Sequence, residues 1–439
     1  MGYIKVKEFK FLCLLYLLFF IINTSYAEKF KEYVLDNGLK VIIKEEHKYP
    51  AVLVQLWYKV GSSYERSSQS GLSYLLEQMS SIVSSDPHTE YLKKLFFEKG
   101  GEYNSRTSLD YTVYTQIAPP QELELALKLE FNRMNNLLFD DQVFSNEKET
   151  LIIKKSLDDQ FNKNLFFRDQ LYKAADPNFW IHDVEELRIN DLRQWYTNWY
   201  TPNNAILIIA GDVKSTEAYN LAQQYFGNIA ARHVNVGLNK SSLHPVLKYK
   251  RLEIKLPIKV QHLFMEYKVP SLNTAKEHWE PYAIEVLIHL LSDGNSCRFS
   301  KYLVRNADPV AFEVKATYNL FRKQDTSLLF SAIPVRHKLL MVVEEAIDQQ
   351  IETLKSTLVS DLELKNVKNR ILANSAYETD SLLEQMNKIG SLESAGYNFG
   401  LTEHRLKEIK GITAKQIQAV AKKYLVKNYL TVVYLMPED

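Results

Sequence analysis

The stretch that decides the fold is Gly71-Leu72-Ser73-Tyr74-Leu75-Leu76-Glu77-Gln78-Met79. It lies within the segment 71–83, which we predict to be a helix. Residues four apart lie on one face of a helix, so Tyr74 and Gln78 share a face and Glu77 stands beside them. Two histidines at that spacing would bind one metal ion while the glutamate activates water. A phenol and a neutral amide cannot do the same at neutral pH.

The start of the chain has the composition of a secretory signal peptide. Three lysines precede the apolar run 11–22, and Ser25-Tyr26-Ala27 offers a small-x-small cleavage point. The run is short for a membrane span, which needs about 20 residues. Cys13 lacks the preceding small residues of a lipoprotein signal. We therefore expect residues 1–27 to be removed, and the chain to be periplasmic or secreted without membrane association afterwards.

The charge balance argues against nucleic acid as a partner. The chain has 54 Lys and Arg against 53 Asp and Glu, and loss of residues 1–27 removes three lysines and one glutamate, leaving 51 against 52. A net charge of −1 gives no basic field for nucleic acid or anionic lipid. Only Cys297 remains after that cleavage. We expect it to be a packed thiol, and stability to come from apolar cores and not from a disulfide.

The two halves of the chain echo each other. Tyr58-Lys59-Val60-Gly61-Ser62 recurs as Tyr267-Lys268-Val269-Pro270-Ser271, and the segment 200–209 recurs as 424–433. Their shared order predicts a tandem duplication. We predict an N-terminal domain over 28–230, a linker over 231–247 that is rich in Asn, Gly, Ser and Pro, and a C-terminal domain over 248–439.

Local patterns predict strands and helices in both halves. Asn37-Gly38 predicts a hairpin within 33–44. Strands are expected at 52–60 and 111–117, and helices at 71–83, 89–99, 121–138 and 141–162. The fold class is therefore α+β, with two similar duplicated domains. Each is expected to be a mainly antiparallel sheet with helices packed on one side, the two facing each other across a cleft.

With these motifs in view, the chain resembles the insulinase/pitrilysin family of inverted-motif zinc peptidases. In that family the stretch 71–79 reads Gly-x-x-His-x-x-Glu-His-Met. Further matching segments occur in the family's order over nearly the whole chain after residue 27: Asp36–Val41, Gly61–Glu65, Gly100–Thr107, Trp199–Val213 and Asn295–Phe299. The resemblance implies a two-domain chain of a kind that often works in pairs, where only one subunit need hold zinc.

The resemblance also implies that the three zinc ligands are replaced by Tyr74, Gln78 and Lys154, while the general base is kept as Glu77. An ammonium group repels a divalent cation. We therefore expect no metal, no cofactor and no hydrolysis by this chain alone. We hypothesise that Lys154 pairs with Glu77, because an uncompensated buried charge is costly. The alternative is that Glu77 is solvated in an open cleft and that Lys154 points elsewhere.

Four more positions are implied in substrate binding. Arg305 and Phe312 stand where the family has an arginine and a tyrosine that help hold the substrate carbonyl, so the phenol hydroxyl is lost. The alternative for Arg305 is an exposed charge at a helix end. Asn104 and Ser105 lie on an expected edge strand, to which an extended peptide would add through backbone groups. The alternative is a polar edge that only discourages aggregation.

These positions predict a noncatalytic peptidase-like subunit that binds extended peptide and pairs with a zinc-bearing homologue. Two alternatives stay open: a stand-alone peptide-binding or scaffold protein, and a residual metalloendopeptidase built around Glu77. The ten histidines are expected to offer no close metal-ligand pair, and His289 is expected to be a core histidine. We find no nucleophile elbow or phosphate-binding loop in the sequence.

Overall fold

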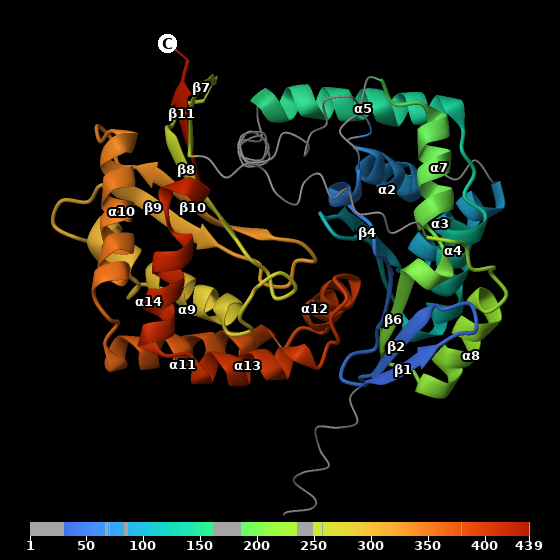
Figure 1. Cartoon of the computed structure of the whole chain (residues 1–439). Helices are drawn as coiled ribbons and strands as arrows, with labels where there is room; N and C mark the ends of the chain where they lie inside the picture. Colours follow the sequence, from blue (N-terminus) through green and yellow to red (C-terminus); the bar gives the residue numbers. More distant parts are fainter. Residues whose placement is uncertain are drawn as a thin grey trace, which may run out of the picture.

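The computed structural model describes residues 30–65, 69, 71–82, 87–160, 186–234, 249–256, 258–378 and 380–438. The predicted signal peptide and most of the predicted linker lie outside these ranges, so the domain boundaries stay predictions. Within the described ranges, the helices are too short or too polar to cross a membrane. Each half of the chain builds one sheet with its own helices (Figure 1).

The N-terminal half forms a six-stranded sheet in the order β1-β2-β6-β3-β5-β4. The predicted hairpin at Asn37-Gly38 is confirmed, since β1 and β2 pair antiparallel and Gly38 has a φ of +84°, which glycine adopts without steric cost. The strands are β1 (Lys31–Val34), β2 (Lys40–Glu45), β3 (Val52–Tyr58), β4 (Glu102–Thr107), β5 (Thr112–Ala118) and β6 (Ala205–Gly211).

Helices cover one face of this sheet. The apolar residues of α2, α4, α7 and α8 meet those of the strands in one core. The predicted helices at 71–83, 89–99, 121–138 and 141–162 are confirmed as α2 to α5, with ends shifted by a few residues. The elements are η1 (Ser62–Tyr64), α2 (Leu72–Ile82), α3 (Pro87–Glu98), η3 (Pro120–Glu122), α4 (Leu123–Asn135), α5 (Asp141–Gln160), α7 (Ile189–Trp199), η5 (Pro202–Asn204) and α8 (Ser215–Phe226).

The C-terminal half forms a five-stranded sheet in the order β7-β11-β8-β10-β9. Its core lies between this sheet and the helices α9, α10, α11 and α14. The elements are β7 (Lys250–Leu256), β8 (His262–Val269), α9 (Glu280–Ser292), η7 (Ser300–Val304), β9 (Ala311–Thr317), β10 (Thr326–Pro334), α10 (Leu340–Ser356), α11 (Asp361–Glu378), α12 (Leu382–Ser394), α13 (Leu401–Gly411), α14 (Ala414–Tyr424), η8 (Lys427–Tyr429) and β11 (Leu430–Pro437).

The two sheets share one pairing scheme, as the duplication predicts. The order β2-β6-β3-β5-β4 in the first sheet matches β7-β11-β8-β10-β9 in the second. In each sheet the first of these pairs is parallel and the next three are antiparallel. The α+β class with two similar domains is therefore confirmed, and both sheets are mixed because each contains one parallel pair.

The second face of the N-terminal sheet is covered by a helix from the other half. Every residue of β3 and β6 is buried, which requires cover on both faces. Helix α12 supplies it: Met386 and Ile389 pack with Trp57, and a Cβ on Gly390 would lie 2.0 Å from the Trp57 ring. Figure 1 shows α12 between the two halves. The sequence does not predict this helix on the second face.

Polar contacts reinforce the junction between the halves. Gln55 Nε2 donates to Asn387 Oδ1 at 2.9 Å, between β3 and α12. Asp110, at the β4–β5 turn, accepts from Arg322 Nε at 2.6 Å, and the two side chains are only 6% and 16% exposed. Lys323 Nζ donates to the Tyr64 hydroxyl at 2.8 Å. The two halves are thus joined by a largely buried ion pair and by hydrogen bonds as well as by apolar packing.

Candidate functional site

Helix α2 begins at a buried carboxylate. Glu65 Oε2 accepts from the Gly71 amide and Oε1 from the Ser73 amide, both at 2.7 Å. These bonds satisfy two of the amides that every helix leaves unpaired at its N-terminus. Gly71 has a φ of +95°, a conformation that favours glycine. Burial raises the pKa of the Glu65 carboxyl to about 7 despite these hydrogen bonds.

Glu77 is enclosed and hydrogen-bonded. It is 2% exposed, and its Oε1 accepts from Ser105 Oγ at 2.7 Å and from Gln78 Nε2 at 3.0 Å. Ser105 lies on β4, against which α2 packs. The alternative of a solvated Glu77 in an open cleft is therefore wrong. Gln78, at a position of the replaced ligands, donates to the carboxylate beside it.

The other two replaced ligand positions are Tyr74 on α2 and Lys154 on α5. Tyr74 is half-buried and packs against the N-terminal core. Lys154 belongs to α5, which contacts α2, but its side chain lies outside the described part of the structure. The pairing of Lys154 with Glu77 therefore stays a hypothesis.

A chain of hydroxyls lies behind Glu77. Ser80 Oγ bonds to the Tyr114 hydroxyl at 2.8 Å, which in turn lies 3.1 Å from the Tyr200 hydroxyl. Burial, chiefly, raises the pKa of both tyrosines, and the charge of Glu77 adds to this for Tyr200. Both phenols therefore stay protonated at neutral pH. They act as neutral hydrogen-bond links, and they supply no anion to a metal.

A buried ion pair supports the far end of α2. Arg133 Nε bonds to Glu130 Oε2 at 2.9 Å, and Arg133 also donates to the Ser80 carbonyl. A cation near the C-terminus of a helix is favourable for the helix dipole. This ion pair and the role of Glu65 at the start of α2 are not among the sequence predictions. The i, i+3 spacing of Glu130 and Arg133 on a helix is a usable signal for the pair.

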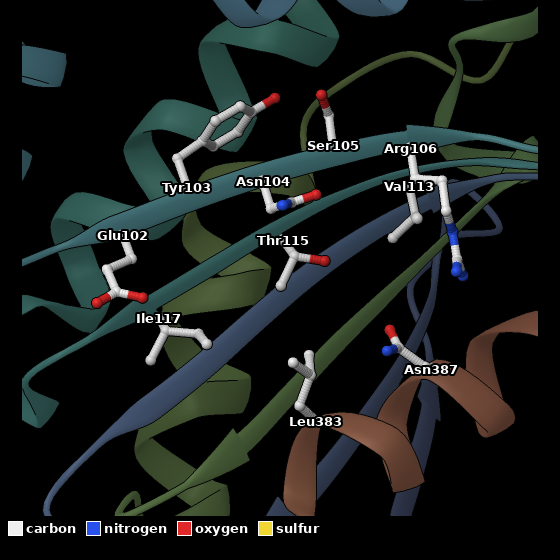
Figure 2. A pocket seen from close by; sticks show the side chains of 10 residues that line it. All are labelled: Glu102, Tyr103, Asn104, Ser105, Arg106, Val113, Thr115, Ile117, Leu383 and Asn387. Carbon is white, nitrogen blue, oxygen red and sulfur yellow. The ribbon is translucent and has the colours of Figure 1, made fainter. Parts of the chain in front are cut away.

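Asn104 and Ser105 lie on the edge strand β4, as predicted, and point to opposite faces. β4 ends the described sheet. Along it exposed and half-buried residues alternate, and Ser105 turns toward α2 while Asn104 is exposed on the opposite side. A cavity of about 350 Å³ lies on that side (Figure 2). Residues of β4, β5 and α12 line it, among them Asn104, Thr115, Leu383 and Asn387.

The structure does not bring Arg305 and Phe312 to this cavity. Arg305 is exposed at the end of η7, in agreement with the alternative of a charge at a helix end. Phe312 is 72% exposed on β9, the edge strand that corresponds to β4 in the second sheet. Neither residue lines the cavity beside β4. A binding role for either stays a prediction.

Family models match most of the chain in two parts. The model described as "Insulinase (Peptidase family M16)" matches residues 40–178, and the model described as "Peptidase M16 inactive domain" matches residues 186–371. The chain belongs to the M16 peptidase family. The first match contains α2 and β4, and the second contains β7 to β10, so both duplicated sheets fall within the family.

Full-length relatives agree with this assignment. The chain is 24% identical to the zinc protease PqqE of Helicobacter pylori over 432 residues, covering 94% of each chain. It is also similar to the crystal structure of a protease from Helicobacter pylori, with a TM-score of 0.83 and 22% identity over 93% of this chain and 100% of that one. At this identity the structural likeness shows the fold.

Two further relatives have names that mention assembly or location. The chain is 24% identical over 204 residues to the mitochondrial-processing peptidase subunit beta of Blastocladiella emersonii, covering 44% of this chain and 43% of that protein. Its fold is similar to the first half of the periplasmic protease PqqL from Escherichia coli, with a TM-score of 0.74, 18% identity, and 93% and 92% coverage.

Proposed function

We propose that this chain is a noncatalytic M16 subunit that binds extended peptide along β4 and pairs with a zinc-bearing homologue. One observation carries the proposal: the retained base Glu77 is buried and engaged by Ser105 and Gln78. A general base has to reach the proton that it abstracts, and here two neighbouring donors occupy it.

The donor set on α2 does not fit a zinc ion. Protein zinc sites use thiolate, imidazole or carboxylate ligands. In this chain the two helix positions hold a phenol and an amide, and the amide of Gln78 donates toward Glu77. The third position is Lys154, whose ammonium would repel a divalent cation. We therefore derive no hydrolytic step for this chain.

Peptide binding is supported by the edge strand. The unpaired backbone side of an edge strand accepts another strand through main-chain hydrogen bonds, and this mode needs no catalytic group. The cavity on the Asn104 side of β4 gives room for alternate side chains of such a peptide. Arg106 and Glu102 at its rim add charges of both signs.

The proposed pairing with a homologue and the proposed location of this chain rest on the names of its relatives. A similar protein is named as a subunit of the mitochondrial-processing peptidase, and a protein of similar fold is named periplasmic. Together with the expected signal peptide at 1–27, these names support an exported chain that acts beside an active homologue. The competing function is a stand-alone peptide-binding protein, for which β4 and its cavity would suffice.

The first experiment separates the catalytic alternatives. The isolated chain, without a tag, is incubated with fluorescein-labelled casein digest at neutral pH, with and without added zinc. We expect binding without cleavage. A variant with Tyr74→His, Gln78→His and Lys154→Glu serves as the comparison that restores the family's ligands. Cleavage by the natural chain that disappears in Glu77→Gln would show a residual peptidase and refute the proposal.

The second experiment locates the peptide. Asn104→Trp places a bulky side chain in the cavity, whereas Asn146→Trp makes the same change on the exposed face of α5. Asn104→Trp should weaken peptide binding at least about tenfold, measured by fluorescence anisotropy, and Asn146→Trp should not. Equal affinities for the two variants would remove β4 as the binding edge. Co-purification from the native source then tests pairing, since recovery without an M16 homologue favours the stand-alone function.

A further inference from the structure

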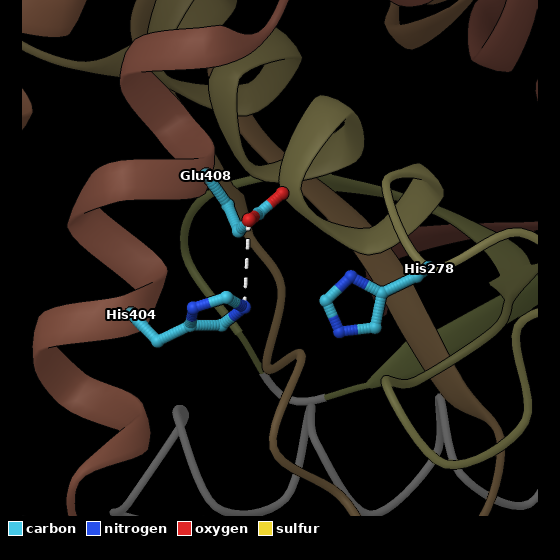
Figure 3. A group of neighbouring side chains, drawn as sticks. All are labelled: His278, His404 and Glu408. Atoms are coloured by element: carbon cyan, nitrogen blue, oxygen red, sulfur yellow. Dashed lines mark ion pairs between the residues drawn. The ribbon is translucent and has the colours of Figure 1, made fainter.

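A second group of metal-binding side chains lies in the C-terminal half. His278, His404 and Glu408 each offer one ligand atom, and these three atoms lie within 4.8 Å of one another (Figure 3). His278 lies two residues before the start of α9, and the other two residues are four apart on α13. The prediction that the histidines offer no close metal-ligand pair is therefore wrong. The i, i+4 spacing on α13 was a signal in the sequence.

The geometry points to a site for a divalent transition-metal ion such as Zn²⁺. Zinc bonds of about 2.0–2.2 Å in a tetrahedron place neighbouring ligands roughly 3.3–3.5 Å apart. His404 Nε2 and Glu408 Oε1 are already 3.4 Å apart. Both histidines are exposed, so their rings can turn inward by the further ångström that the third ligand needs.

The chemistry of the three ligands selects the class of ion. Two imidazoles and one carboxylate suit zinc, copper or nickel, whereas magnesium and calcium prefer oxygen ligands alone. Three protein ligands leave a coordination position open to water or a partner's side chain. The nearest guanidinium in sequence, Arg405, is engaged with Glu285 at 2.9 Å. That ion pair offsets the positive charge beside the site.

A buried hydroxyl beside the site has no hydrogen-bond partner in the described structure. Tyr282 is fully buried, and its ring packs 5.4 Å from that of His278. Unpartnered buried polar groups are rare in proteins. A group bound at this cluster would supply the missing partner.

This inference does not depend on the proposed function, and it changes how a zinc measurement is to be interpreted. One zinc per chain would usually be assigned to the peptidase helix. Here the same stoichiometry is expected from α13, in a different half of the chain. The assay must therefore locate the ion as well as count it.

The test is zinc binding to the untagged full chain, by equilibrium dialysis with elemental analysis and by calorimetry. We expect one Zn²⁺ per chain, no binding of Mg²⁺, and at least a tenfold loss of affinity in His404→Gln and in His278→Gln, since loss of even an indirect partner of a metal costs 10-fold or more. Glu408→Gln removes the carboxylate ligand, and Glu403→Gln is its matched control. Glu403 is exposed and lies one residue before His404, so Glu403→Gln should bind Zn²⁺ like the natural chain.

Two results would overturn the inference. Unchanged affinity in both histidine variants, with circular dichroism like that of the natural chain, would show that these side chains do not hold the ion. Loss of zinc in Glu77→Gln alone would place the ion on α2, and would contradict the proposed function as well. If zinc binds neither at α13 nor on α2, the inferred metal site is refuted and the proposed function stands. The two failures are therefore distinguishable.

Discussion

Replacement of Glu65 by glutamine is expected to remove a specific pH dependence from the stability of the protein. Glu65 is 6% exposed and binds the first amides of α2, the helix that carries Glu77. Its pKa is raised from 4.5 to about 7 because burial penalises the charged form more than the helix amides favour it. The folded protein therefore holds this proton more tightly than the unfolded chain does.

The sign and size of the contribution of Glu65 to the unfolding free energy follow from proton linkage. Below pH 4.5 the carboxyl is protonated in both states, and its contribution is fully present. Between pH 4.5 and 7 the unfolded chain releases the proton first, so rising pH favours unfolding until the folded state also ionises. A change in pKa from 4.5 to about 7 corresponds to about 3 kcal/mol, at about 1.4 kcal/mol for each tenfold change in proton affinity.

Urea unfolding at pH 5 and at pH 8 measures this effect. The difference in unfolding free energy between Glu65→Gln and the natural chain should shift by about 2–3 kcal/mol in favour of the variant at pH 8. Glu45→Gln is the matched control, because Glu45 also binds the first amide of a helix, that of Ser215, but its pKa is lowered to about 2. The effect of Glu45→Gln on the unfolding free energy should vary with pH only below about pH 4.5. A shift under about 0.5 kcal/mol for Glu65→Gln would refute the reasoning.

Two other substitutions test the site and the junction. Ser105→Ala removes a 2.7 Å hydrogen bond to the buried Glu77 carboxylate and should lower the unfolding free energy by about 1.5–3 kcal/mol. The loss should be smaller in a Glu77→Gln background. Equal losses in both backgrounds would show that the two side chains are not energetically coupled. Gly390→Ala drives a methyl into the Trp57 ring and should cost about 1–3 kcal/mol in thermal unfolding, whereas Gly411→Ala meets no described atom within 4 Å and should be nearly neutral.

Much of the fold could be predicted because local patterns and pairing agree. The Asn37-Gly38 turn, the buried strand at 52–60 and the helix at 71–83 each follow from a local pattern, and the recurrence of 58–62 at 267–271 gives the duplicated sheet. The edge position of Asn104 also follows, because the family match fixes which strand is outermost.

The contacts that complete the site could not be predicted in the same way. Glu77 and Ser105 meet only through the packing of α2 on β4, and nothing in the local pattern of 71–79 indicates that Gln78 would donate to the carboxylate. Helix α12 belongs to the C-terminal half of the sequence, and no local pattern indicates that it packs on the N-terminal sheet. Its docking on β3 and β6 brings together residues far apart in the sequence, such as Gln55 and Asn387, which are 332 positions apart and share a hydrogen bond.

From the docking of α12 we expect that neither half of this chain folds completely by itself. A fragment that stops near residue 230 would leave the indole of Trp57 and the apolar side chains of β6 facing water. The C-terminal fragment would carry α12 without the sheet on which it packs. Cutting the gene at the linker would therefore yield two polypeptides that have to reassemble by complementation before either is fully ordered.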